Sequence, residues 1–302
     1  MNVEPQEPAA SQAAIKLGGG ASFRRLAPVR LAIFVCCLLA GDIAAQISRV
    51  WVLRHVPRGV TDFVALPLAI ALCAMLIGLY VLLVRSLERR KAAEARPNAV
   101  WAATGVVLGF GLFSSVLALL WLIGNVRWRG PSAHFDLIPA IAAAMLAAVG
   151  EELALRGGAF RILEDTFGTT IALVLSAALF GLLHAANPGA TVVSTVAIAL
   201  EAGVLLAAAY ALTRNLWLPI GIHFGWNFTE SGVFGAVGSG FGGRNGAFSA
   251  TFSGPTLLTG GTFGPEASVV AVAVTLIAAA VLIIMTTRRG LWIPARARLW
   301  LD

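Results

Sequence analysis

Long apolar segments separated by short polar breaks account for most of this chain. A bilayer core about 30 Å thick is crossed by about 20 apolar residues of α-helix. Eight segments reach or approach that length, so the pattern predicts an all-α, polytopic membrane protein with about eight transmembrane helices. The predicted spans are residues 31–53, 60–84, 100–124, 136–163, 169–187, 190–212, 215–232 and 267–287.

The segments outside the spans differ from them in composition. Residues 1–28 contain glutamate, proline and three consecutive glycines without an apolar stretch of signal-peptide length, so we predict a flexible cytoplasmic tail. Residues 29–132 hold the N-terminal transmembrane helices, and residues 291–302 are predicted to be a short cytoplasmic tail. Residues 232–265 contain 11 glycines and no strong helical period, which predicts a loop on the far side or a re-entrant segment.

The distribution of lysine and arginine predicts the orientation of the chain. With a cytoplasmic N-terminus, 15 of the 22 basic residues face the cytoplasm, 6 face the other side, and Arg156 lies within a span. Cytoplasmic loops carry such an excess in multi-pass proteins. We therefore expect a multi-pass protein of the plasma or inner membrane with both termini in the cytoplasm.

Composition supports this class and excludes several others. The chain is 58% hydrophobic and 12% charged, whereas about 25% of residues are charged in soluble domains. Too few polar groups are present to cover a soluble surface. Intrinsic disorder and a disulfide scaffold are also excluded as the main state. The net charge of +7 reflects arginines at span ends, so we expect membrane lipids as partners and no nucleic acid.

Charged side chains within a predicted span are the first candidates for function. A charge near the bilayer centre costs about 2.5–3.5 kcal/mol, and such groups usually face a bundle interior or a wet cavity. Glu152 and Arg156 are four residues apart and can pair on one helix face, which favours a role in holding helices together. Glu151 has no such intrahelical partner and needs a metal, a histidine or a water molecule. Direct chemistry is the favoured interpretation for Glu151.

Two histidines lie within spans, each with an aromatic or polar residue four positions away. Phe180 shares a helix face with His184, and His223 shares one with Asn227. A single histidine in a span is often only a hydrogen-bonding packing residue. Together with Glu151, the two imidazoles make the ligand set of a catalytic zinc site. The same groups could instead activate a water without metal, with the carboxylate as general base, and the spacing favours neither alternative.

The predicted boundaries place these three groups at different depths. Glu151 is in the middle of its span, and His184 is nearer the far end of its own span. His223 is about 12 Å from the cytoplasmic end, at a rise of about 1.5 Å per residue. A shared site therefore requires tilted or shifted helices.

In this order, the three segments resemble the CPBP family, the CaaX-protease and bacteriocin-processing group of intramembrane metalloproteases, also called abortive-infection-like proteins. The family's motifs are two glutamates followed after three residues by arginine, a phenylalanine with histidine four later, and a histidine with asparagine four later. They are matched by Glu151, Glu152 and Arg156, by Phe180 and His184, and by His223 and Asn227. The match covers about the C-terminal half of the chain and implies a CPBP-like protease core over residues 133–290.

This resemblance implies an intramembrane endopeptidase that hydrolyses membrane-associated or prenylated, CaaX-type peptide or protein substrates. Glu151 would activate the attacking water, and His184 would assist it or bind a metal. His223 and Asn227 would hold the metal or stabilise the oxyanion. Zinc is the metal expected if one is bound, with Glu151, His184 and His223 as its ligands. The side chains expected to orient these groups are Glu152, Arg156 and Phe180.

Two other interpretations stay open. A catalytically inert relative, acting as a membrane scaffold, immunity factor or regulator, would use the same polar residues for packing or partner binding. A small-solute transporter would use them as proton relays, although no repeated halves are visible. Glu201 in the sixth span and Asp42 in the first belong to none of the three motifs, and the pattern assigns them no role.

Overall fold

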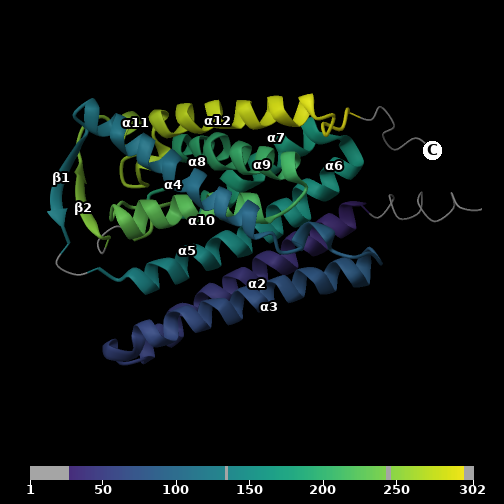
Figure 1. Ribbon diagram of the computed structural model, residues 1–302, viewed down its shortest axis with the longest axis horizontal. Helices are drawn as coiled ribbons and strands as arrows, with labels where there is room; N and C mark the ends of the chain where they lie inside the picture. The colour runs from purple at the N-terminus through teal and green to yellow at the C-terminus, as the bar shows by residue number, and fades with distance from the viewer. Residues whose placement is uncertain (1–26, 133–134, 243–245, 296–302) are drawn as a thin grey trace, which may run out of the picture.

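The protein is a bundle of long helices with a small β-sheet at one end (Figure 1). The computed structural model describes residues 27–132, 135–242 and 246–295. The predicted tail 1–28 lies outside these ranges except for its last two residues, and the predicted tail 291–302 lies outside them beyond residue 295. Both tails therefore stay predictions.

The long helices run back and forth between the two ends of the bundle (Figure 1). The elements in chain order are α2 (Ala27–His55), α3 (Thr61–Leu87), α4 (Ala99–Leu122), β1 (Val126–Pro131), α5 (Leu137–Glu152), α6 (Arg161–Phe167), α7 (Thr169–His184), α8 (Val192–Ile198), α9 (Val204–Thr213), α10 (Trp217–Asn227), β2 (Phe248–Phe252), α11 (Thr256–Thr259) and α12 (Val269–Arg288). The wider turns of a π-helix occur at Leu153–Phe160, Ala199–Gly203 and Phe228–Val233. Short 3-10 turns lie at Arg58–Val60, Ala93–Ala95 and Pro265–Ala267.

The helices confirm an all-α, polytopic membrane protein. Within the described ranges, six are long and apolar enough to cross a membrane: Ala27–His55, Thr61–Leu87, Ala99–Leu122, Leu137–Phe167, Val192–Thr213 and Val269–Arg288. The two other predicted spans are shorter, because α7 has 16 residues and α10 has 11 residues followed by a π-helical turn of 6. The expected number of eight spans is therefore not confirmed.

A turn at Gly168 aligns two helices that the sequence places at different depths. Gly168 has φ +87° and separates α6 from α7, a backbone conformation that glycine adopts without a steric cost. Glu151 lies 17 residues before this glycine, and His184 lies 16 residues after it. In an antiparallel helical hairpin, residues equally far from the turn lie at the same level. The turn thus removes the difference in depth that the predicted span boundaries implied for this pair.

Glycines bring α4 and α10 into backbone contact. A Cβ atom at Gly105 would lie 2.7 Å from the amide nitrogen of Ile222 and 2.8 Å from the Cα atom of Gly221. A Cβ atom at Gly109 would overlap the carbonyl oxygen of Ile222. Only glycine permits so close an approach. The third motif lies on α10, so α4, from the segment without motifs, determines where that motif stands.

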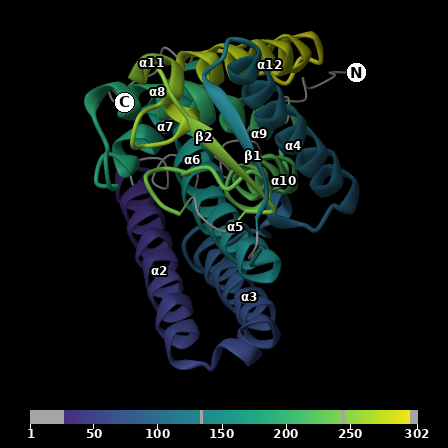
Figure 2. The same cartoon turned by 90° about the vertical axis from the view of Figure 1, so that its left-hand side faces the viewer.

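The glycine-rich stretch contains regular structure that its composition does not reveal. Strand β2 pairs antiparallel with β1, with Val126 opposite Phe252. Figure 2 shows the two strands crossing the end of the bundle. The expectation of a loop or re-entrant segment over residues 232–265 is thus wrong where β2 and the short helix α11 form. The two strands are more than a hundred residues apart in sequence, so no local pattern marks their pairing.

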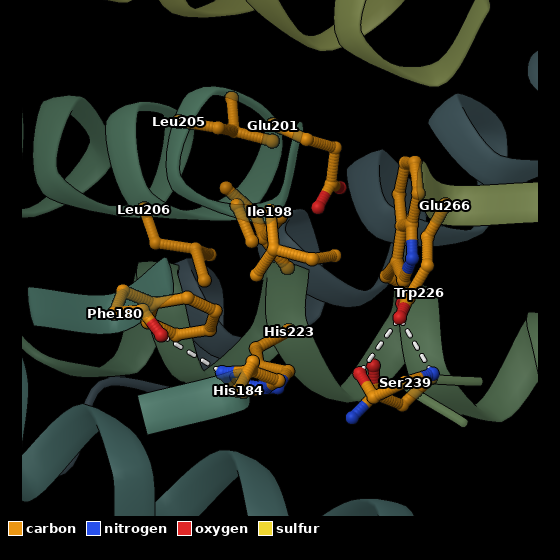
Figure 3. Close-up of a pocket in the computed structure, with 13 residues that line it drawn as sticks. Phe180, His184, Ile198, Glu201, Leu205, Leu206, His223, Trp226, Ser239 and Glu266 are labelled. Carbon is orange, nitrogen blue, oxygen red and sulfur yellow. Dashed lines mark hydrogen bonds between the residues drawn. The ribbon is translucent and has the colours of Figure 1, made fainter. Parts of the chain in front are cut away.

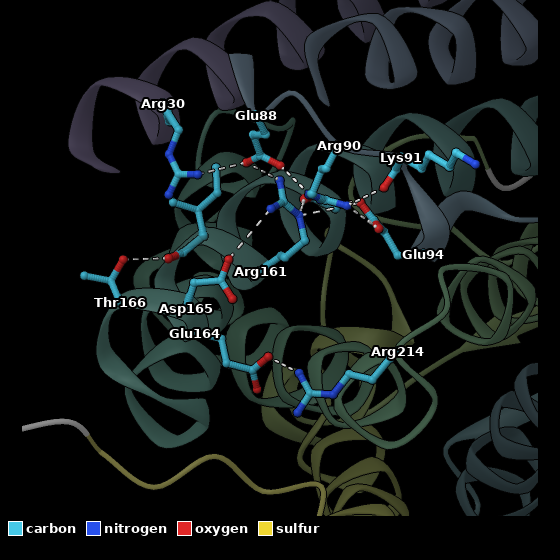
Figure 4. Close-up of polar contacts among 12 residues, drawn as sticks. Arg30, Glu88, Arg90, Lys91, Glu94, Arg161, Glu164, Asp165, Thr166 and Arg214 are labelled. Carbon is cyan, nitrogen blue, oxygen red and sulfur yellow. Dashed lines mark hydrogen bonds and ion pairs between the residues drawn. The ribbon is translucent and has the colours of Figure 1, made fainter. Parts of the chain in front are cut away.

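A network of ion pairs joins the helices at the opposite end of the bundle (Figure 4). The carboxylate of Glu88, after α3, accepts from Arg30 of α2 at 3.3 Å and from Arg161 of α6 at 2.9 Å. Arg90 donates to Glu88 at 2.8 Å and to Glu94 at 2.7 Å. These arginines belong to the side that the charge distribution predicts to be cytoplasmic.

Glu94 is the carboxylate of this network with the most distinctive surroundings outside the spans. It is 6% exposed and accepts hydrogen bonds from Arg90 and from the hydroxyl of Tyr80. Burial raises the pKa of Glu94, but the hydrogen bonds from Arg90 and Tyr80 outweigh it, so the pKa lies below its ordinary value. Ionised Glu94 therefore stabilises the folded chain.

We expect Gly109→Ala to destabilise the protein by about 1–3 kcal/mol, because the added methyl group forces α4 away from α10. Gly111→Ala is the matched control, because a Cβ atom at Gly111 meets nothing within 4 Å. Thermal melting in detergent should show a lower transition temperature for the first variant only. Equal melting temperatures would contradict the close contact.

We expect Glu94→Gln to lower stability at neutral pH by about 1.5–3 kcal/mol, because charge-assisted hydrogen bonds are lost. The pKa of Glu94 is lowered in the folded chain, so its contribution is present above its ordinary value of 4.5 and is lost as pH falls through the lowered value. Thermal melting from pH 7 down to about pH 3 should therefore show a smaller acid-induced loss in the variant than in the parent. Parallel pH profiles would contradict this assignment.

Candidate active site

The two glutamates of the first motif end α5, and the motif's arginine lies in the π-helical segment that follows. Glu152 is 0% exposed, and its Oε1 atom accepts a hydrogen bond from Nη1 of Arg156 at 2.7 Å. The same oxygen lies 3.2 Å from Nδ1 of His223 on α10. Because a carboxylate only accepts, the Nδ1 atom of His223 carries the proton in this hydrogen bond. One carboxylate thus joins α5 to the third motif.

Arg156 extends this connection to a further helix. It is 0% exposed, and its Nη2 atom donates to the carbonyl oxygens of Ala202 at 3.2 Å and Gly203 at 3.1 Å. These carbonyls belong to the π-helical segment before α9. The guanidinium also lies over the ring of Phe180, 4.8 Å from its centroid, in a cation–π arrangement. Arg156 therefore links the three motifs by ionic, hydrogen-bond and aromatic contacts.

Phe180 positions His184 by two contacts. The rings are stacked, with centroids 4.7 Å apart and planes 17° apart. The Nδ1 atom of His184 lies 2.9 Å from the carbonyl oxygen of Phe180. A carbonyl oxygen only accepts, so Nδ1 of His184 carries the proton. In the neutral ring the Nε2 atom therefore presents a lone pair.

Glu151 faces that lone pair. Its Oε2 atom lies 3.9 Å from Nε2 of His184, which is too long for a direct hydrogen bond. Oε2 is buried and has no hydrogen-bond partner in the described part of the chain. Two acceptors at this separation call for a donor that reaches both, and a water molecule has two O–H groups. The pair is therefore suited to hold and activate one water.

The motif residues also share a cavity (Figure 3). His184, His223 and Asn227 line it together with Phe180, and its volume is about 20 Å³. That is room for about one water-sized group. Glu151 does not line the cavity itself but lies beside it, next to His184.

All seven residues predicted from the sequence therefore lie in one region of the bundle. Glu151 faces His184, Glu152 joins Arg156 to His223, Phe180 stacks on His184, and Asn227 lies in the cavity wall.

Several residues that the motifs did not include line the same cavity. Glu201, Trp226, Ser239 and Glu266 contribute side chains to its wall, and Glu266 accepts from the amide and the hydroxyl of Ser239 at 2.5 and 2.7 Å. Glu201 was visible as a charge in a span. Its distance of 13 residues before the turn at Arg214, equal to that of Asn227 after it, is the signal that could have placed it. Glu266 follows the glycine-rich stretch and has no such signal.

Asp42 approaches the site from α2. Its side chain is 8% exposed and packs so closely on Gly150 that a Cβ atom there would overlap its Oδ1 atom. This oxygen has no hydrogen-bond partner among the residues described. The residue that the sequence left without a role therefore lies against the backbone directly before Glu151.

The arrangement does not form a ready metal site. Across the described ranges, no group of three or more His, Cys, Asp or Glu side chains is placed to hold a metal ion. Glu151 and His184 are 3.9 Å apart, and the Nδ1 atom of His223 is engaged by Glu152. Catalytic zinc takes three protein ligands at about 2.0–2.2 Å. The residues fit a water better than a metal, and the zinc site expected from the sequence stays a prediction.

Comparison with known families gives one match. Residues 132–229 match the family described as Type II CAAX prenyl endopeptidase Rce1-like. The matched segment contains all three motifs, so it confirms the resemblance derived from them. Searches among curated proteins and among solved structures find no match.

We expect Arg156→Met to destabilise the protein by about 3–5 kcal/mol, because it leaves the carboxylate of Glu152 buried without its cation. The double variant Glu152→Gln/Arg156→Met removes both charges and should cost less than the sum of the two single variants. Thermal or denaturant unfolding of the four proteins measures this coupling. Additive losses would show that the buried pair contributes no specific interaction.

Proposed function

We propose that this chain, whose residues 132–229 belong to the Rce1-like family of type II CAAX prenyl endopeptidases, is an intramembrane endopeptidase. Its substrates are membrane-associated or prenylated, CaaX-type peptides. The observation that carries the proposal is the pair formed by Glu151 and His184, two acceptors 3.9 Å apart beside a cavity and without a donor between them.

Glu151 is the general base of the proposed reaction. It takes a proton from the water while the water oxygen bonds to the carbonyl carbon of the scissile peptide. Nε2 of His184 accepts the second O–H group of the water and aims its oxygen at that carbon. Glu151 then returns its proton to the amide nitrogen as the C–N bond breaks. The products are a carboxyl group and an amine.

Charge that develops on the carbonyl oxygen needs a donor. The carboxamide of Asn227 lines the cavity and supplies an N–H group for this purpose. Each such donor contributes about 2.7–4 kcal/mol to catalysis in other hydrolases. His223 lies one helical turn before Asn227, and its hydrogen bond to Glu152 keeps this face of α10 directed at the cavity.

The surroundings of the site support a membrane substrate. The motif helices lie among spans whose outer faces are apolar, with exposed side chains such as Leu182 at 64% and Ile277 at 68%. A peptide reaches this site most directly from the bilayer or its surface. The clustered arginines at one end of the bundle support the predicted orientation, with both termini in the cytoplasm of a plasma or inner membrane.

We expect Glu151→Gln to abolish cleavage and Asn227→Ala to lower kcat by about 10²–10³-fold, because one removes the base and the other an oxyanion donor. The assay uses the purified full chain in detergent with two fluorogenic peptides, a farnesylated CaaX peptide and an unprenylated transmembrane peptide. Asp62→Asn, which removes an exposed carboxylate of α3, is the control and should cleave like the parent.

Three outcomes separate the competing interpretations. Cleavage by Glu151→Gln at the parental rate contradicts the role of the base. A parent that cleaves neither peptide supports the inert scaffold or regulator. Metal analysis of the same samples tests zinc: cleavage that survives chelation supports the metal-free water, whereas one equivalent of zinc lost in both His184→Ala and His223→Ala supports the metal.

A further inference from the structure

One wall of the cavity carries negative charge that the proposed reaction does not use. Glu201, 2% exposed, and Glu266, 3% exposed, both line the cavity, and Figure 3 shows the Glu201 carboxylate pointing into it. Behind them lies Glu230, 1% exposed, whose Oε1 atom has no hydrogen-bond partner in the described chain. Among the ion pairs of the described residues, none involves these three carboxylates, and no Lys or Arg lines the cavity.

An unpaired donor lies in the same wall. Trp226 is 5% exposed and lines the cavity, and its Nε1 atom is buried without a hydrogen-bond partner among described residues. An indole N–H only donates. A buried donor without an acceptor is costly, and a bound ligand that brings a carbonyl oxygen would satisfy it. This observation is independent of the acidic groups and indicates an occupant with an acceptor.

We propose that Glu201, Trp226 and Glu266 form the substrate subsite and that it selects a peptide with a lysine close to the scissile bond. This inference rests on the proposed function. A peptide carbonyl accepts from the indole of Trp226, while the ammonium group pairs with the two carboxylates. The cavity volume of about 20 Å³ suits one ammonium group. The aliphatic stem then lies along the apolar wall of Leu205 and Leu206.

Other occupants satisfy only part of these requirements. A phosphate, a lipid headgroup phosphate or a free carboxyl terminus offers acceptors to Trp226 but is repelled by Glu201 and Glu266. A metal ion pairs with carboxylates but offers no acceptor for an indole, and the described residues include no metal-binding group of three. A lysine-containing peptide meets both requirements at once.

The structural role of Glu266 does not account for the whole wall. Glu266 anchors the glycine-rich segment through Ser239. Glu201 makes no side-chain hydrogen bond or ion pair of this kind with another side chain in the described ranges. A buried carboxylate in a span without a cation carries a cost that proteins mostly accept at functional sites.

Peptide binding tests the subsite without requiring turnover. A fluorescently labelled membrane peptide is made with lysine or with norleucine, its neutral analogue, at each position in turn. Fluorescence anisotropy then gives the affinity of each peptide for the full chain carrying Glu151→Gln, which prevents cleavage. The same background carries Glu201→Gln, Glu266→Gln or Trp226→Phe, and Asp62→Asn is the matched control for loss of one carboxylate.

We expect lysine to bind at least tenfold more tightly than norleucine at one position, and this ratio to fall towards one in Glu201→Gln and Glu266→Gln. Trp226→Phe should weaken both peptides by a similar factor, because it removes the carbonyl contact and not the charge. Asp62→Asn should leave the ratio as in its parent. Thermal melting identifies any variant that fails to fold, and the second glutamine variant then decides.

A lysine-to-norleucine ratio near one at every position, or a ratio that both folded glutamine variants retain, overturns the subsite. The two proposals fail in different ways. A chain that prefers lysine in binding and cleaves no peptide keeps the subsite and loses the peptidase. A chain that cleaves both peptides equally well keeps the peptidase and loses the subsite.

Discussion

The buried carboxylate of Glu152 is the interaction on which the arrangement of the site depends. It is shared between Arg156 and His223, in a region from which water and lipid are excluded. A charge in such surroundings is stable only with well-placed partners. Those partners come from separate helices, so meeting this one requirement brings the first and third motifs together. The carbonyl contacts of Arg156 and its position over Phe180 then add the remaining helices.

Two backbone features make that convergence possible. The turn at Gly168 folds α7 back so that its last residue stands level with the end of α5. The glycines of α4 let that helix approach α10 at backbone distance. The site is therefore not confined to the matched segment 132–229, since α4, Asp42 of α2 and Glu266 all contribute to its surroundings.

Hydrogen-bond direction determines the chemistry that these side chains can perform. The carbonyl of Phe180 holds the proton of His184 on Nδ1, which leaves Nε2 to accept, and Glu151 offers a second acceptor facing it. Water between two acceptors is polarised for attack, and a carboxylate is a competent base. The acidic wall with Trp226 lies in the same cavity, so recognition and hydrolysis would occur side by side.

The sequence alone determined the membrane class, most helix positions and the candidate residues, because apolar length and four-residue spacing are local properties that survive in any packing. It also separated Glu151 from the pair formed by Glu152 and Arg156. Tertiary structure alone decided that His184 stands level with Glu151, that β1 pairs with β2, and that Glu266 reaches the cavity. These depend on turns and on contacts between distant segments, and a distant contact leaves no periodic trace in the chain.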